Sequence, residues 1–268
     1  MSRSEYAFIG AGKMATAIAL GLRKSGVPAE KIHACDISPA AAEAFTRATG
    51  SKTASMAEAL KEAEIVILAV KPQYAAGALE EAKSCLQGKL LISIAAGLTI
   101  TWLSEHAGTK RIVRVMPNTP ALAGEGMSCY AGAPGIANAD LEAAGEVLKS
   151  VGLARVVSES QLDAVTGLSG SGPAYVMEFI LALADGGVYC GLPRALAMEM
   201  AIQTVLGTAK MCRESGQSVS DLRDAVISPA GTTARGILAL QKAGFKGTVS
   251  EAVIAGAERS AELGGKKG

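Results

Sequence analysis

The chain has 268 residues, of which 49% are hydrophobic and 19% are charged. A chain of this length and composition buries a core and forms one large or two modest domains, which excludes an intrinsically disordered protein. Its 26 Lys and Arg residues balance 25 Asp and Glu residues, so we expect no basic surface for nucleic acid.

Membrane and metal-binding proteins are not expected either. The first six residues lack the apolar core of a signal peptide, and the longest aliphatic run, residues 65–70, is too short to span a bilayer. The five cysteines are scattered singly, and only His33 and His106 are available to complete a metal site. We therefore expect a cytoplasmic protein, without metal, that acts on a small molecule.

The first half of the chain alternates between strand and helix patterns. Residues 6–9 form an apolar run before a glycine turn and a helix that ends near Gly26. Ser55 and Glu58 have the spacing of a capping box at the start of a later helix. Unbroken aliphatic runs indicate strands covered on both faces, and hence an α/β fold with a parallel, doubly wound, Rossmann-like sheet. The other expected elements are strands at 31–36, near Lys52, at 65–70, 90–94 and 111–116, and a helix at 39–48.

The glycine turn lies between strand and helix, which is the context that a dinucleotide-binding motif requires. Gly10 permits the tight turn, Gly12 lets the backbone approach a pyrophosphate, and Ala15 keeps the helix close to the sheet. Free amides at the helix start attract the phosphate charge. The candidate pyrophosphate-binding residues are therefore Gly10, Ala11, Gly12, Lys13, Met14 and Ala15.

Asp36 ends the second expected strand, where a carboxylate accepts hydrogen bonds from the adenosine ribose of NAD(H) and repels the extra phosphate of NADP(H). The alternative role for Asp36 is to cap the turn before Pro39. A lysine or arginine from another segment would offset the repulsion. The sequence therefore leaves the choice between NADH and NADPH open.

The pattern changes after Ser158, and almost every segment from Gln161 onward is helical. The stretches 174–184 and 195–211 are apolar around much of their circumference, which is typical of a bundle core or a large subunit interface. We expect a dinucleotide-binding domain at residues 1–157. The second domain, residues 158–268, is expected to be all-α, to bind the substrate and to form a dimer.

A segment rich in small residues and hydroxyls precedes one of these helices. A helix that begins near Gly231 presents unpaired backbone amides and the positive end of its dipole, which bind a carboxylate without any arginine. The alternative is an ordinary cap, in which Ser228 or Thr232 accepts hydrogen bonds from amides of the same helix.

Five motifs follow one another along the chain: Phe8 to Ala15, Ala69 to Pro72, Met116 to Pro120, Ser169 to Tyr175, and Ser228 to Thr233. In this order they resemble the motifs of the pyrroline-5-carboxylate reductases, which catalyse the last step of proline biosynthesis. The resemblance covers nearly the whole chain. It implies a Rossmann domain followed by a helical domain that interlocks with its twofold mate, with larger homo-oligomers in some members.

The resemblance also implies a reaction and its residues. Hydride passes from NADPH or NADH to the cyclic imine of 1-pyrroline-5-carboxylate, which gives L-proline. Thr233 would hydrogen-bond the substrate nitrogen, and the loop of Ser228, Ala230, Gly231 and Thr232 would hold its carboxylate. Asn118 would lie near the nicotinamide, and the path of the cofactor would be lined by Ala69, Val70, Lys71, Pro72, Ala95 and Ala96.

One departure and two alternatives accompany this interpretation. The position of Ala230 is usually glycine in the family, and a left-handed backbone there would cost alanine about 1 to 2 kcal/mol. The first alternative function is a reductase of another imine or of a hydroxyacid, built on the same two-domain plan. The second is a dimer that senses NAD(P) without turnover.

Overall fold

The computed structural model describes residues 4–265 and divides into two compact units. The first unit holds the chain up to Ser171 and again from Ala255 onward, and the second holds Gly172–Ile254. The first is an α/β unit and the second is helical, as the sequence predicts.

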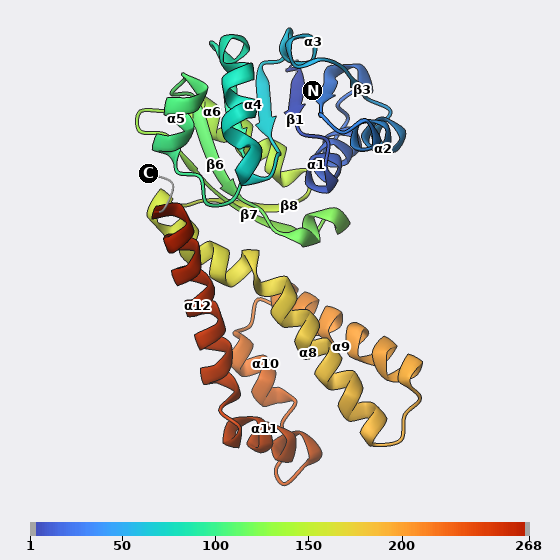
Figure 1. Ribbon diagram of the computed structural model, residues 1–268. Helices are drawn as coiled ribbons and strands as arrows, with labels where there is room; N and C mark the ends of the chain where they lie inside the picture. The colour runs from blue at the N-terminus through green and yellow to red at the C-terminus, as the bar shows by residue number, and fades with distance from the viewer. Residues whose placement is uncertain (1–3, 266–268) are drawn as a thin grey trace. The chain divides into compact units, whose positions relative to one another are not determined.

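The first unit is built on one eight-stranded sheet of order β3-β2-β1-β4-β5-β6-β7-β8 (Figure 1). Strands β1 to β6 run parallel to one another, whereas β7 runs antiparallel to β6 and β8 runs parallel to β7. The predicted parallel sheet is thus extended by two strands that the sequence did not reveal. The strands are β1 Tyr6–Ile9, β2 Ile32–Cys35, β3 Lys52–Thr53, β4 Ile65–Leu68, β5 Leu90–Ser93, β6 Ile112–Met116, β7 Gly126–Gly132 and β8 Gly152–Val156.

Helices cover both faces of the sheet, which explains why its central strands are continuously apolar. One face packs against α1 Lys13–Lys24, α2 Pro39–Thr49 and α6 Asn138–Lys149. The other packs against α3 Met56–Leu60, α4 Pro72–Ala82, α5 Ile100–Ala107 and α7 Leu162–Val165. The result is a three-layer, doubly wound unit.

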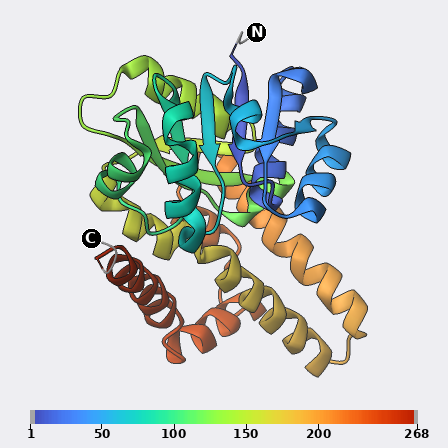
Figure 2. The same cartoon turned by 45° about the horizontal axis from the view of Figure 1, so that its top comes forward.

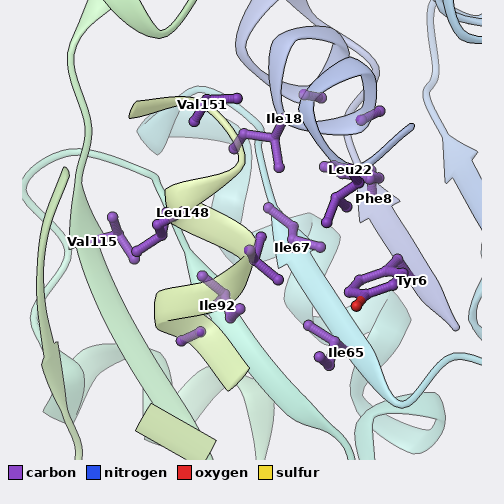
Figure 3. Close-up of a cluster of buried hydrophobic side chains, with 14 of the residues drawn as sticks. Tyr6, Phe8, Ile18, Leu22, Ile65, Ile67, Ile92, Val115, Leu148 and Val151 are labelled. Atoms are coloured by element: carbon purple, nitrogen blue, oxygen red, sulfur yellow. The ribbon is translucent and has the colours of Figure 1, made fainter. Parts of the chain in front are cut away.

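The layer beneath α1 and α6 is a continuous hydrophobic core (Figure 3). Ile18 of α1 and Leu148 of α6 point onto the sheet, where they meet Ile67 and Ile92 of the central strands. Phe8 belongs to the same core and packs on Phe45, with ring centroids 5.8 Å apart. This core fixes the direction in which α1 leaves the glycine turn.

The predicted capping box at the start of α3 is confirmed. The Glu58 amide donates to Ser55 Oγ at 3.4 Å, and the Ser55 amide donates to Glu58 Oε2 at 3.3 Å. The Ser55 hydroxyl also donates to Glu58 Oε2 at 2.7 Å. This bond, and the weaker one from the Ser55 amide, lower the pKa of Glu58 because they stabilise its carboxylate.

The segment that follows β8 packs on the sheet and contacts the end of the last helix. It contains a 3-10 turn at Glu159–Gln161, α7 and a π-helix at Thr166–Gly170. Leu162 is 1% exposed in the core, and Asp163 accepts a 2.6 Å hydrogen bond from Ser260 of the last helix. The compact units therefore divide after Ser171, later than the boundary expected after Val157.

The second unit consists of α8 Gly172–Tyr189, α9 Arg194–Glu214, α10 Val219–Ala225, α11 Thr232–Lys242 and the first part of α12 Phe245–Gly265. Helices α8 and α9 lie side by side (Figure 2). Their close approach needs small residues, because a Cβ on Gly187 would lie 3.2 Å from the Cβ of Ala197. Tyr175 also ties α8 to α12, since its hydroxyl donates to the carbonyl of Ala252 at 3.1 Å.

The second unit leaves many large apolar side chains on its surface. Its buried hydrophobic cluster contains Ala184, Ala197 and Ala201, with a few partly buried side chains packed against it, whereas many other large apolar side chains of α8 and α9 are exposed. An exposed apolar surface of this extent is typical of a subunit interface. The exposed side chains on these two helices are Val176, Met177, Leu181, Leu183, Tyr189, Leu196, Met200, Ile202, Leu206 and Met211.

No helix within residues 4–265 is long and apolar enough to cross a membrane. The same residues contain no cluster of three or more His, Cys, Asp or Glu side chains that could hold a metal ion. Cys35 and Cys129 are buried, and burial raises the pKa of the Cys35 thiol to about 12. Cys190 is exposed.

Candidate active site

The loops after five parallel strands meet at one edge of the sheet. Strands β2, β1, β4, β5 and β6 are neighbours and run in the same direction, so their carboxyl ends coincide. The Gly10 amide donates to the carbonyl of Cys35 at 2.8 Å, and the Ala69 amide donates to the carbonyl of Ile9 at 2.8 Å. The chain order reverses between β1 and β4, which is the switch point where open α/β sheets bind ligands. The structure thus brings the predicted cofactor segments to this edge.

The two glycines of the turn have different physical roles. Gly10 has φ +99°, and a Cβ there would lie 2.9 Å from the carbonyl carbon and oxygen of Ala69. Gly10 is therefore required by the fold itself. Gly12 has φ −74°, which any residue adopts, and a Cβ there would meet nothing within 4 Å. Its missing side chain keeps space open in front of α1.

The start of α1 fits a pyrophosphate. Gly12 is the N-cap residue and no side chain caps the helix, whose first turn contains no acidic residue. The amides of the first turn have no partner within the helix, and they carry the positive end of its dipole. Among the predicted residues of this turn, Ala11 and Ala15 are buried, Met14 is half-buried, and Gly12 and Lys13 are exposed.

Asp36 connects the glycine turn to the loop after β2. Its Oδ2 accepts a 2.7 Å hydrogen bond from the Ala11 amide, and its Oδ1 accepts one of 2.8 Å from the Ser38 amide. The second bond confirms the alternative that Asp36 caps the turn before Pro39. The hydrogen bond from the Ala11 amide was not predicted, because Ala11 lies in the loop after β1 and Asp36 lies in the loop after β2. Asp36 is only half-buried, so its carboxylate stays accessible.

The loops after β4 and β5 expose backbone at the same edge. Lys71 is the N-cap residue of α4, its side chain is exposed, and Pro72 opens the helix. Ala95 is buried and its amide donates to Ser93 Oγ at 3.4 Å, whereas Ala96 is exposed. Their predicted contacts with a cofactor remain predictions.

Asn118 has a structural role that the sequence did not reveal. Its Nδ2 donates to the carbonyl of Ser169 at 3.1 Å, and its Oδ1 accepts from the Met127 amide at 2.8 Å. It therefore ties the end of β6 to the start of β7 and to the π-helix. Close packing reinforces the contact, because a Cβ on Gly170 would lie 2.4 Å from Cε of Met116. The role of Asn118 beside the nicotinamide stays a prediction.

The predicted substrate loop is a tight turn in the second unit. The Gly231 amide donates to the carbonyl of Ser228 at 3.0 Å, with Pro229 and Ala230 at the corner. Ala230 has φ +57° and is the one non-glycine residue with a positive φ within residues 4–265. In a type II turn, proline is common at the second position and the third residue has a positive φ. Glycine adopts a positive φ without strain, which explains why it is preferred at the position of Ala230.

The start of α11 is uncapped. Gly231 is its N-cap residue, no side chain caps it, and neither Ser228 nor Thr232 makes the hydrogen bond that an ordinary cap requires among the described residues. Ser228 Oγ lies beside the helix start, 2.2 Å from where a Cβ on Gly231 would be. Ser228 and Thr232 are exposed and Thr233 is half-buried. The geometry thus leaves the first amides of α11 available to an anion.

Comparison with known proteins agrees with both halves of this arrangement. Residues 159–263 match the family model for pyrroline-5-carboxylate reductase dimerisation, and residues 5–97 match the model for NADP oxidoreductase, coenzyme F420-dependent. A pyrroline-5-carboxylate reductase of Arabidopsis thaliana is 45% identical over 259 residues, which are 96% of this chain and 94% of the plant protein. The chain belongs to the pyrroline-5-carboxylate reductase family.

Solved structures of the pyrroline-5-carboxylate reductase family share the fold over its full length. The enzyme of Coxiella burnetii has a TM-score of 0.93 at 34% identity, and the alignment covers 98% of this chain and 99% of that one. The pyrroline carboxylate reductase of Plasmodium falciparum, solved with NADP bound, has a TM-score of 0.87 at 36% identity with the same coverage. The resemblance drawn from the five motifs is confirmed.

Proposed function

We propose that this chain reduces the cyclic imine of 1-pyrroline-5-carboxylate to L-proline, with NADPH or NADH as cofactor. The observation that supports this best is the 45% identity with a reductase of that name over 96% of the chain. The bound nicotinamide coenzyme supplies the hydride. Every other task falls to residues of the chain.

The start of α11 is the proposed carboxylate site. The amides of Thr232 and Thr233 lie in the uncapped first turn, and the Ser228 hydroxyl lies beside them. A carboxylate there gains hydrogen bonds from backbone donors and the favourable end of the helix dipole. Residues Ser228, Ala230, Gly231, Thr232 and Thr233 form this proposed site.

Thr233 is the proposed catalytic residue. Its half-buried hydroxyl would hydrogen-bond the ring nitrogen, whose position relative to the carboxylate is fixed by the five-membered ring. A protonated cyclic imine is already an electrophile, so hydride addition to its carbon leaves the proton on nitrogen and gives the secondary amine. The residues of the site then have to orient the ring and exclude water, and this explains why no strong acid or base is required.

The proposed cofactor site occupies the carboxyl edge of the sheet. The first turn of α1 would hold the pyrophosphate, and Asp36 would meet the ribose. The proposed cofactor-binding residues are Gly10, Ala11, Gly12, Lys13, Met14, Ala15, Asp36, Ala69, Val70, Lys71, Pro72, Ala95, Ala96 and Asn118.

The helical region is the proposed assembly domain. Its match to a dimerisation family and its exposed apolar side chains support a homo-oligomer built on a dimer. We propose that residues 1–157 bind the cofactor and that residues 158–268 bind the substrate and form the oligomer. The proposed compartment is the cytoplasm. Light scattering at several protein concentrations tests the assembly, and cell fractionation tests the compartment.

The decisive experiment is oxidation of NADH and of NADPH, at matched concentrations, by the purified protein with racemic 1-pyrroline-5-carboxylate. L-proline is then quantified separately. We expect L-proline to form in proportion to the coenzyme oxidised. The Gly236→Ala variant is a matched control, since a Cβ at this position of α11 meets nothing within 4 Å, and it is expected to retain full turnover.

Absence of L-proline would contradict the proposal if the protein is folded and binds coenzyme. Oxidation of coenzyme with another cyclic imine, or reduction of a ketoacid to a hydroxyacid, would then favour a different reductase on the same plan. Binding without turnover of any of these substrates would favour an NAD(P)-sensing dimer.

A further inference from the structure

The carboxylate of Asp36 is held in place from two sides. The Ala11 amide reaches Oδ2 from the glycine turn, and the Ser38 amide reaches Oδ1 from the loop after β2. Both oxygens act as acceptors, as an ionised carboxylate requires. Rotation of the side chain would break both hydrogen bonds, so the negative charge stays at the end of β2.

We propose that Asp36 makes this chain select NADH over NADPH. The inference rests on the proposed function and names the coenzyme that the same site takes. The position of Asp36 in the sequence leaves the choice between NADH and NADPH undecided. The two hydrogen bonds that fix its carboxylate give a physical reason for choosing NADH.

The carboxylate retains the capacity to bind a ribose. Two carboxylate oxygens offer about four acceptor positions, and the two backbone amides use one on each oxygen. The remaining positions accept hydrogen bonds from ribose hydroxyls, which donate. NADH carries a free 2′-hydroxyl on its adenosine ribose, so it satisfies this arrangement.

NADPH carries a phosphate in place of that hydroxyl. This group is an acceptor with nearly two negative charges, so it cannot donate to Asp36 and is repelled by it. A site for NADPH would need a cation to balance these charges. The loop after β2 supplies none, because no Lys or Arg occurs between Lys31 and Arg47.

The rest of the loop strengthens this argument. Ile37, the residue after Asp36, is 92% exposed and has no charge. The Ser38 hydroxyl accepts from the Ala41 amide as the N-cap of α2 and is not a cation either. Asp36 forms no ion pair with any residue in 4–265.

The test is a fluorescence titration that measures the dissociation constants of NADH and NADPH for the intact protein without substrate. We expect NADH to bind on the order of ten- to a thousand-fold more tightly, because one extra doubly charged group faces a fixed carboxylate. The ratio of kcat/KM values for the two coenzymes with 1-pyrroline-5-carboxylate should shift in the same direction.

Two variants separate the charge of Asp36 from its structural role. Asp36→Asn removes the charge and keeps the shape, so the affinity ratio should fall at least tenfold, mainly through tighter NADPH binding. Asp36→Ser removes the carboxylate altogether and should lower the ratio as well. The matched control is Glu30→Gln, which removes a charge from an exposed residue before the other end of β2 and should leave the ratio unchanged.

The titrations decide the proposal even if a variant folds poorly, since the ratio of the unmodified protein is measured first. Equal affinities or a preference for NADPH in that protein would overturn the proposal. So would an unchanged ratio in a folded Asp36→Asn variant. Selective binding of NADH without formation of L-proline would instead leave this proposal standing and contradict the proposed function.

Discussion

Nη1 of Arg114 in β6 donates a hydrogen bond of 3.0 Å to Oε1 of Glu159, in the segment that follows β8. The Arg114 side chain is 9% exposed and Glu159 is 35% exposed. The same oxygen of Glu159 accepts a 2.7 Å hydrogen bond from the amide of Ile100, at the start of α5. One carboxylate therefore joins β6, α5 and the segment that leads toward the helical unit.

Removing Glu159 should destabilise the first unit. Glu159→Ala leaves the buried guanidinium of Arg114 without its anion and the Ile100 amide without its acceptor. We expect the free energy of unfolding, measured in urea, to fall by about 1 to 3 kcal/mol. The control is Glu105→Ala on the exposed face of α5, where the change should stay within about 0.5 kcal/mol. Equal losses in both variants would show that the bridge contributes nothing specific.

Gly12→Ala should separate cofactor binding from stability. The new methyl group meets no atom of the chain within 4 Å, so the melting temperature should hardly change. It would occupy the space through which a pyrophosphate approaches the first turn of α1, and the affinity for NADH should fall roughly tenfold or more. Gly77→Ala in α4, which also meets nothing within 4 Å, should leave this affinity unchanged. An unaltered affinity in Gly12→Ala would remove the glycine turn from the proposed site.

Ala230→Gly should stabilise the protein. Ala230 holds φ +57°, which is strained for an L-residue with a Cβ, and glycine relieves this strain at some cost in unfolded-state entropy. The net gain should be about 0.5 to 1 kcal/mol in the free energy of unfolding at fixed protein concentration. Ala239→Gly, inside α11, should instead lose about 1 kcal/mol. A loss of similar size in both variants would mean that the turn imposes no strain.

Thr233→Ala should reduce turnover while leaving coenzyme binding intact. If its hydroxyl bonds the ring nitrogen in the transition state, kcat/KM for 1-pyrroline-5-carboxylate should fall roughly ten- to a thousand-fold. Thr233→Ser keeps the hydroxyl and should restore most of the activity. The dissociation constant of NADH, measured without substrate, should match that of the unmodified protein in both variants. Full activity of Thr233→Ala would exclude Thr233 as a catalytic residue.

Local sequence patterns predicted most elements of the α/β unit. The unbroken aliphatic run from Ile65 predicts a strand that is covered on both faces. The structure agrees, because β4 is buried throughout. The capping box and the start of α11 were also predicted from residues close together in the chain. In contrast, β7 was missed, because its seven residues show neither a continuous aliphatic run nor an alternating pattern.

The direction of β7 depends on tertiary structure. The 3-10 helix at Thr119–Ala123 returns the chain directly beside β6, so Tyr130 pairs with Val115 in an antiparallel register. The packing of the segment after β8 also could not be predicted from its local sequence pattern. Its helical pattern suggested a place with the later helices, yet Leu162 is buried in the α/β core and Glu159 binds Arg114.

By itself, the sequence determined the Rossmann-like unit and the helical second half, because these follow from burial patterns and short-range hydrogen bonds. The family and the roles of the two loops followed from the resemblance of the five motifs. Only the tertiary structure decided how residues from separate loops meet. It placed the Ala11 amide on Asp36 and the Asn118 amide between Met127 and Ser169. Such contacts depend on which strands are neighbours in the sheet, and strand order is a property of the folded chain rather than of any local pattern.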